Sequence, residues 1–128
     1  QISSPTQLSG TTWSNIACGQ KTTIATKTDG TLWTMGYNDE GQLGQNNVVF
    51  RSSPTQIPGT NWHLTNFRIM STSGGALAMK QDGTLWAWGN STSGQFGLNS
   101  NTQLSSPTQV TGTWHSIGGG QAISGLKA

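Results

Sequence analysis

The segment DGTLWTMGYNDEGQLG, residues 29–44, decides the fold, because it returns 53 positions later as DGTLWAWGNSTSGQFG, residues 82–97. An Asp-Gly pair between two β-prone runs is the strongest short-range signal of a β-hairpin, since both residues tolerate the positive φ angles of a type I′ turn. We therefore expect residues 22–28 to pair with residues 31–36, and residues 75–81 to pair with residues 84–89.

A second recurring block marks the boundaries between copies. The pattern SSPTQ, followed by an aliphatic residue, begins at residues 3, 52 and 105, and each copy continues to a Trp at residue 13, 62 or 114. A period of about 50 residues is typical of repeat architectures such as propellers. The chain divides into repeats of residues 1–51 and 52–104 and an incomplete third repeat, residues 105–128.

Short β-prone runs between Gly, Pro and Asn give about four strands in each repeat. Besides the hairpins, residues 5–8 and 13–19 are expected to form strands. Pro5, Pro54 and Pro107 should lie at strand starts or on an edge strand, because proline cannot donate to a β-ladder. No segment shows the sustained 3.6-residue apolar period of a helix. The sequence therefore predicts an all-β chain of four-stranded antiparallel β-propeller blades, about two and a half repeats long.

Tryptophan recurs at two positions of the repeat, residues 13, 62 and 114 at one and residues 33 and 86 at the other. One buried Trp side chain removes about 150 to 250 Å² from water. Repeat proteins place their core residues periodically. We therefore expect these rings to pack between neighbouring blades rather than to stack on a ligand.

The combination of KTDGTLW, residues 27–33, with GYNDEGQLG, residues 36–44, resembles the regulator of chromosome condensation repeat. The resemblance implies a β-propeller, usually of seven four-stranded blades. We therefore expect this chain to be a fragment of a larger propeller, because it does not begin with Met and ends at Lys127-Ala128, where DGTLW should follow. The SPTQ and DGTLWxWG blocks are similar to those of the bacterial and viral branch of the family.

The composition argues against several kinds of partner. Only 8% of the residues are charged, against about 25% in ordinary soluble proteins. The six Lys and Arg residues are scattered, so we expect no nucleic-acid binding, which needs cations clustered on one face. A lone Cys18 excludes an internal disulfide and a zinc site built on cysteines. No run approaches the roughly 20 apolar residues of a membrane span.

The residues suited to catalysis lack partners in the sequence. His63 and His115 follow the repeat Trp at the position that Ser14 holds in the first copy, which is a variable position of the repeat. Asp29 and Asp82 are explained by their turns, and no Gly-x-Ser-x-Gly elbow occurs. We expect no enzyme activity, no cofactor and no metal site. A glycan-active enzyme, which needs two carboxylates about 5 to 10 Å apart, is an improbable alternative.

Function on a repeat scaffold is usually carried by the segments in which the copies differ. Phe67 beside Arg68 is the best candidate anchor, because aromatic residues and Arg dominate interface hot spots. An equal alternative is that Phe67 replaces Trp13 in the core. The candidate partner-binding residues are His63, Asn66, Phe67, Arg68, Asn38, Asp39, Glu40, Phe50 and Arg51.

These observations favour a non-catalytic module that recognises a protein or a cell-surface glycan through its loops. It would belong to a virion or another surface assembly or oligomer, so an extracellular surface or a virion is favoured over the cytoplasm. The resemblance implies a different function, guanine-nucleotide exchange on a small GTPase or chromatin-associated regulation. That alternative rests on fold analogy.

Overall fold

The computed structural model describes residues 4–64, 69–72, 74–91, 96, 98, 102–119 and 123–127. Within these ranges the chain consists of β-strands joined by turns and loops, which confirms the predicted all-β class. No helix with the length and apolar character needed to cross a membrane occurs among the described residues.

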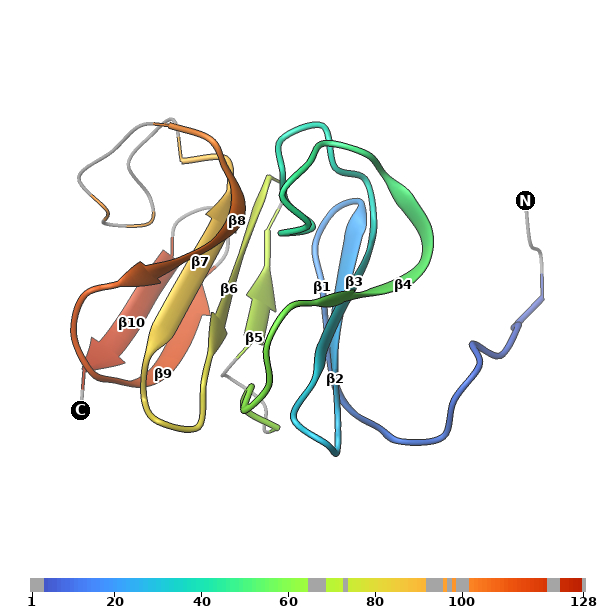
Figure 1. The fold of residues 1–128 in the computed structure, drawn as a ribbon, viewed down its shortest axis with the longest axis horizontal. Helices are drawn as coiled ribbons and strands as arrows, with labels where there is room; N and C mark the ends of the chain where they lie inside the picture. The colour runs from blue at the N-terminus through green and yellow to red at the C-terminus, as the bar shows by residue number, and fades with distance from the viewer. Residues whose placement is uncertain are drawn as a thin grey trace.

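The described strands form three antiparallel sheets that stand side by side (Figure 1). The first sheet has the order β1-β2-β3-β4, the second has the order β5-β6-β7-β8, and β9 pairs with β10. The strands are β1 Trp13–Cys18, β2 Thr22–Lys27, β3 Leu32–Gly36, β4 Arg51–Ile57, β5 Ile69–Ser71, β6 Gly75–Met79, β7 Leu85–Gly89, β8 Leu104–Val110, β9 Trp114–Gly119 and β10 Ile123–Lys127.

The two predicted Asp-Gly hairpins form as β2-β3 and β6-β7, but the predicted turn type is wrong. Gly30 has a φ of 81°, whereas Asp29 does not have a positive φ. The Asp29 carboxylate accepts hydrogen bonds from the backbone N–H of Thr31 at 3.0 Å and from its hydroxyl at 2.6 Å. Such a side-chain bond to the residue two positions ahead favours an Asx-type turn. Lys27 N–H donates to Thr31 O, which closes a three-residue loop with a glycine bulge.

Each four-stranded sheet takes its last strand from the next repeat of the sequence. β4 and β8 contain the second and third SSPTQ blocks, and they pair with β3 and β7 at Leu32↔Ile57 and Leu85↔Val110. Both are edge strands, as predicted from their prolines. The strand predicted at residues 5–8 is wrong, since residues 4–12 form no strand. The physical reason is that this block has no counterpart of β3 or β7 beside it among the described residues.

The core lies between the sheets. Ile24, Leu32 and Ile57 of the first sheet pack in one cluster with Trp62, Ala78 and Trp88 of the second blade, and each is at most 1% exposed. A second cluster joins Leu77, Leu85 and Val110 to Phe96. Burying a large aliphatic or aromatic side chain contributes about 1.5 to 3 kcal/mol, so the first cluster binds the two four-stranded blades to each other. The predicted packing between blades is confirmed for Trp62, with Trp86 packed against the same cluster.

Candidate functional site

The loop between β3 and β4, residues 37–50, connects two strands of the first blade and also contacts the second blade. Its Gln42 backbone oxygen accepts a hydrogen bond of 2.9 Å from Trp88 Nε1. The Glu40 carboxylate accepts a hydrogen bond of 2.8 Å from Asn90 Nδ2. The Asn46 N–H donates to a backbone oxygen of β8 at 2.7 Å. Glu40, predicted as a partner-binding residue, is therefore already engaged in holding two blades together.

Asn38, near the start of this loop, is buried and bonds to residues near the end of the loop. Its side chain is 0% exposed; Nδ2 donates to Asn47 O at 2.9 Å and to Val49 O at 3.0 Å, and Oδ1 accepts from Leu43 N at 2.9 Å. A side chain buried in this way cannot touch another molecule, so the prediction of Asn38 as a partner-binding residue is wrong. Its neighbour Asp39 is exposed.

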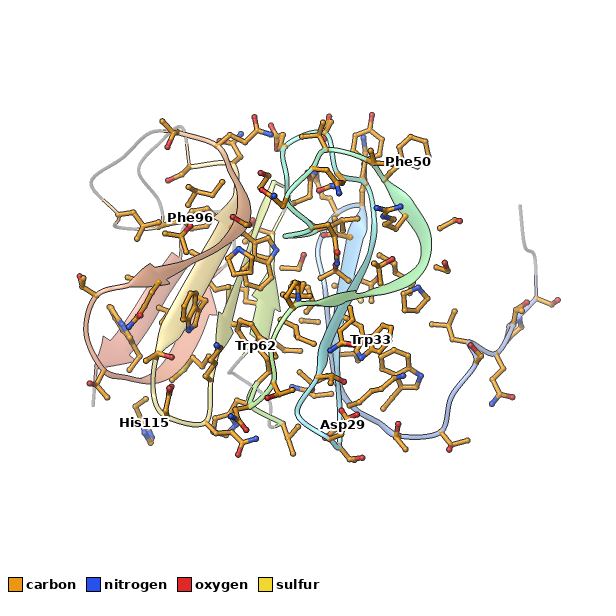
Figure 2. The ribbon with its side chains drawn as sticks, in the orientation of Figure 1. Asp29, Trp33, Phe50, Trp62, Phe96 and His115 are labelled. Carbon is orange, nitrogen blue, oxygen red and sulfur yellow. The ribbon has the colours of Figure 1, made fainter. Side chains whose placement is uncertain are left out.

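The other predicted residues are spread over the molecule. His63 is half-buried, and its backbone N–H donates to Met79 O at 2.9 Å. Asn66, Phe67 and Arg68 lie outside the described residues, so their role stays a prediction. Arg51 is the first residue of β4 and Phe50 directly precedes it; the label of Phe50 marks this end of the first sheet in Figure 2.

An exposed apolar patch surrounds Phe50, and we define it as Tyr37, Val48, Val49 and Phe50. These side chains are 42%, 54%, 53% and 69% exposed. Phe50 points away from the interblade core that Trp62 marks in Figure 2. At the four equivalent positions, 53 residues later, the second repeat has only polar residues: Asn90, Asn101, Thr102 and Gln103. The apolar patch is thus not repeated at the equivalent positions of the second repeat.

The apolar patch stands on a fixed loop. Besides the bonds of Asn38, the Val49 N–H donates to Asn47 Oδ1 at 3.0 Å, and Asn47 Nδ2 donates to Gln45 O at 2.9 Å. The Gln45 side chain in turn donates to Thr55 O in β4 at 3.2 Å. A surface held in one conformation loses little entropy when a partner binds. Sequence reasoning missed Tyr37, which a position-by-position comparison with Asn90 would have found.

A hollow of about 460 Å³ lies on the outer face of the first sheet, with Trp13, Trp33 and Met35 in its lining. The Trp13 and Trp33 rings meet edge to face at 6.1 Å, and Lys27 Nζ lies 4.0 Å from the Trp33 ring centre. In the second sheet, Lys80 lies over the Trp62 and Trp86 rings in the same way. There the two Trp side chains pack against residues of the first sheet. The lining is therefore of the type that packs between blades.

Asp29 lies at the end of the molecule opposite Phe50 (Figure 2). Hydrogen bonds from the Thr31 side chain and backbone lower the pKa of Asp29, and Thr84 lowers the pKa of Asp82 in the same way. Both carboxylates are therefore ionised parts of their turns. The described residues include no group of three His, Cys, Asp or Glu side chains that could hold a metal ion.

The sequence pattern of the Regulator of chromosome condensation (RCC1) repeat matches residues 29–76 and 82–124, and a second form of it matches residues 13–42. The chain belongs to the RCC1 repeat family. Similar proteins include the Ultraviolet-B receptor UVR8 of Arabidopsis thaliana, 34% identical over 108 residues, and the X-linked retinitis pigmentosa GTPase regulator of Homo sapiens, 32% identical over 98 residues. The matches cover 82% and 74% of this chain, but only 24% and 9% of those proteins.

Solved structures share the arrangement of the blades. Human WBSCR16 is 25% identical with a TM-score of 0.73, over 90% of this chain and 30% of that chain. Yeast RCC1 (Prp20) bound to Kap60 is 22% identical with a TM-score of 0.71, over 99% of this chain and 32% of that chain. The predicted RCC1-type propeller blades are confirmed, and this chain spans about a third of the propeller proteins that it matches.

Proposed function

We propose that this RCC1-repeat chain is a non-catalytic module that binds another protein through the loop end of its first blade. The observation that carries the proposal is the apolar patch, which is exposed on a fixed loop and has polar counterparts in the second blade. A contiguous exposed apolar surface rimmed by polar residues is typical of a protein interaction site. Its aromatic members are of the kind that dominate interface hot spots.

The proposal that the chain is not an enzyme rests on the hydrogen bonds that its carboxylates already accept. The chain has four acidic residues, and each accepts a hydrogen bond within its own turn or blade junction. Asp29 and Asp82 bond to threonines in their turns, Glu40 bonds to Asn90, and Asp39 accepts from Gln42 Nε2 at 3.2 Å. A general acid or base must instead be directed at a substrate.

A surface-exposed or virion-type assembly is the setting that we propose for this module, because only 8% of the residues are charged.

A glycan partner is less well supported than a protein partner. Sugars stack on the open face of an aromatic ring, whereas Lys21 Nζ already lies over the Tyr37 ring, 4.6 Å from its centre.

Regulation of a small GTPase is the second candidate function. It is favoured by the names of similar proteins, which include a GTPase regulator and the yeast Prp20p studied for its binding to Gsp1p and histones. Of the two acidic residues in the 37–50 loop, Glu40 accepts a hydrogen bond from Asn90 of the second blade, whereas Asp39 is exposed. A nucleotide-exchange assay with purified small GTPases separates the two proposals, since only a regulator would accelerate nucleotide release.

The direct test is photo-crosslinking from the apolar patch. A benzophenone amino acid replaces Phe50 in one variant and Gln103, its counterpart in the second blade, in a matched control. We expect a protein adduct from position 50 and little from position 103. The adduct should disappear when Val48, Val49 and Tyr37 take the polar residues of the second blade. Equal adducts from both positions, or adducts that survive the polar replacements, would contradict the proposal.

A further inference from the structure

Lys21 lies beside the apolar patch because of the register of the first sheet, and Arg51 follows Phe50 in the chain. Gly36 pairs with Thr22 on one side and with Arg51 on the other. One residue further out, the strand ends place Lys21, Tyr37 and Phe50 next to one another. The Tyr37 N–H donates to Lys21 O at 2.9 Å, and Lys21 Nζ lies 4.6 Å from the centre of the Tyr37 ring.

The second blade has the same strand register but none of this chemistry. Gly89 pairs with Gly75 and with Leu104, so the corresponding row is Gly74, Asn90 and Gln103. Both cations and both aromatic rings of the first blade are replaced there by uncharged, non-aromatic residues. The charge and the apolar surface therefore occur together, on one blade, at one end of one sheet.

Neither cation is neutralised within the described part of the chain, since neither Lys21 nor Arg51 forms an ion pair there. Arg51 is half-buried, and its Nε atom is fully buried without a hydrogen-bond partner. An anionic group of a partner can approach Lys21, which is exposed, and the exposed part of the half-buried Arg51 side chain. A carboxylate is well suited, because it can accept two parallel bonds from a guanidinium.

We propose that the apolar patch, with Lys21 and Arg51, recognises a short acidic segment of a protein partner in which carboxylates alternate with apolar side chains. This inference rests on the proposed function and defines the chemistry of its partner. The carboxylates pair with Lys21 and Arg51, and an apolar side chain of the segment packs against Phe50. Charge complementarity decides which segments bind, and the aromatic contact supplies most of the affinity.

An anionic membrane surface fits the same residues less well. Recognition of acidic lipids typically uses clusters of four to eight Lys or Arg residues, whereas this surface has two. Asp39 is exposed on the adjoining loop, beside Glu40, and a negatively charged bilayer would repel both. A peptide segment can place its carboxylates over the two cations and leave Asp39 uncovered.

The test begins with selection of random twelve-residue peptides displayed on phage against the full chain. Selected peptides are labelled with fluorescein, and their affinity is measured by fluorescence anisotropy. We expect enriched peptides to contain both Asp or Glu and apolar residues. Phe50→Gln should weaken binding at least tenfold, as removal of an interface anchor does. Arg51→Leu should weaken it about tenfold, and Lys21→Gln about threefold, because Lys21 is exposed.

The matched control is Gln103→Phe in the second blade, which adds an aromatic ring without the cations, removes the 3.2 Å bond from Gln103 Nε2 to the Asp39 backbone oxygen, and should gain no affinity for the peptide. Charge reversal gives the sharpest result: Lys21→Glu should lose binding to the selected peptide and recover it when one peptide acid is replaced by Lys. Raising the salt concentration should weaken binding of the wild type more than of the Arg51→Leu variant.

Several outcomes would overturn the inference. These are enrichment of peptides without acids, unchanged affinity in the Lys21 and Arg51 variants, failure to select any peptide, or stronger binding to phosphatidylcholine vesicles with phosphatidylserine than to the peptides. If Phe50→Gln still removed peptide binding while the charge variants did not, the proposed protein-binding function would stand and only the acidic chemistry would fail. Loss of crosslinking from position 50 would instead refute the proposed function itself.

Discussion

Replacing Trp88 by Phe should loosen the junction between the first two blades. Trp88 is 0% exposed, and its Nε1 donates to the Gln42 backbone oxygen at 2.9 Å across that junction. The substitution leaves a buried carbonyl without its donor, at about 1 to 3 kcal/mol. The smaller ring leaves a cavity worth about 1 kcal/mol more. The free energy of unfolding should therefore fall by about 2 to 4 kcal/mol.

Urea unfolding followed by far-ultraviolet circular dichroism measures the effect. For an m-value of about 2 kcal/mol/M, the midpoint should fall by roughly 1 to 2 M. Trp86→Phe is the matched control, because Trp86 is half-buried and its Nε1 donates to Thr84 Oγ1 within the same hairpin region. Its midpoint should fall by less than half as much. Equal shifts for the two variants would refute the importance of the bond across the junction.

Three further predictions concern the turn and the patch. Gly30→Ala should destabilise the chain by about 1 to 2 kcal/mol in the same urea assay, because Gly30 has a φ of 81° that a Cβ atom disfavours; an unchanged midpoint would contradict this. The pKa of Asp29 is lowered by its Thr31 hydrogen bonds, so its contribution to stability is complete above the unfolded-state pKa and is lost as the pH falls through the folded-state pKa. Asp29→Asn should therefore flatten the acid limb of stability against pH, and an unaltered limb would argue against that role. Phe50→Gln should change stability by less than about 0.5 kcal/mol, because Phe50 is 69% exposed; a larger loss would mean that Phe50 serves the fold.

The hairpins and the class of fold could be predicted from the sequence, because Asp-Gly turns and alternating β-prone runs are local signals. The turn type could not, since it depends on the side-chain bonds between Asp29 and Thr31. The strand expected at residues 5–8 fails for a different reason. The same SSPTQ block forms β4 and β8 only where β3 or β7 lies beside it, so its structure is decided by a neighbour and not by its own residues.

The candidate site was only partly predictable for the same reason. Phe50 and Arg51 were found because they lie in a segment where the repeats differ. Lys21 and Tyr37 were not, because they lie 29 and 13 positions before Phe50 in the chain and meet it only through the strand register. The burial of Asn38 could not be read from the sequence, because differing residues in a loop look alike there whether they face solvent or lie inside; the role of Glu40 in partner binding stays a prediction.

The contrast between the two blades explains how one scaffold can hold both roles. Residues that fix the blade recur in both copies: the Asp-Gly turn, the Trp on the third strand, and the Lys that lies over the Trp rings. These positions pack between sheets or close turns, so a change there costs stability. The side chains around Phe50 are exposed, whereas their counterparts Asn90 and Gln103 donate hydrogen bonds to Glu40 and to the Asp39 backbone oxygen of the first blade. An apolar and cationic surface that is confined to the strand ends around Phe50, and absent from the sister blade, is better explained by binding than by folding.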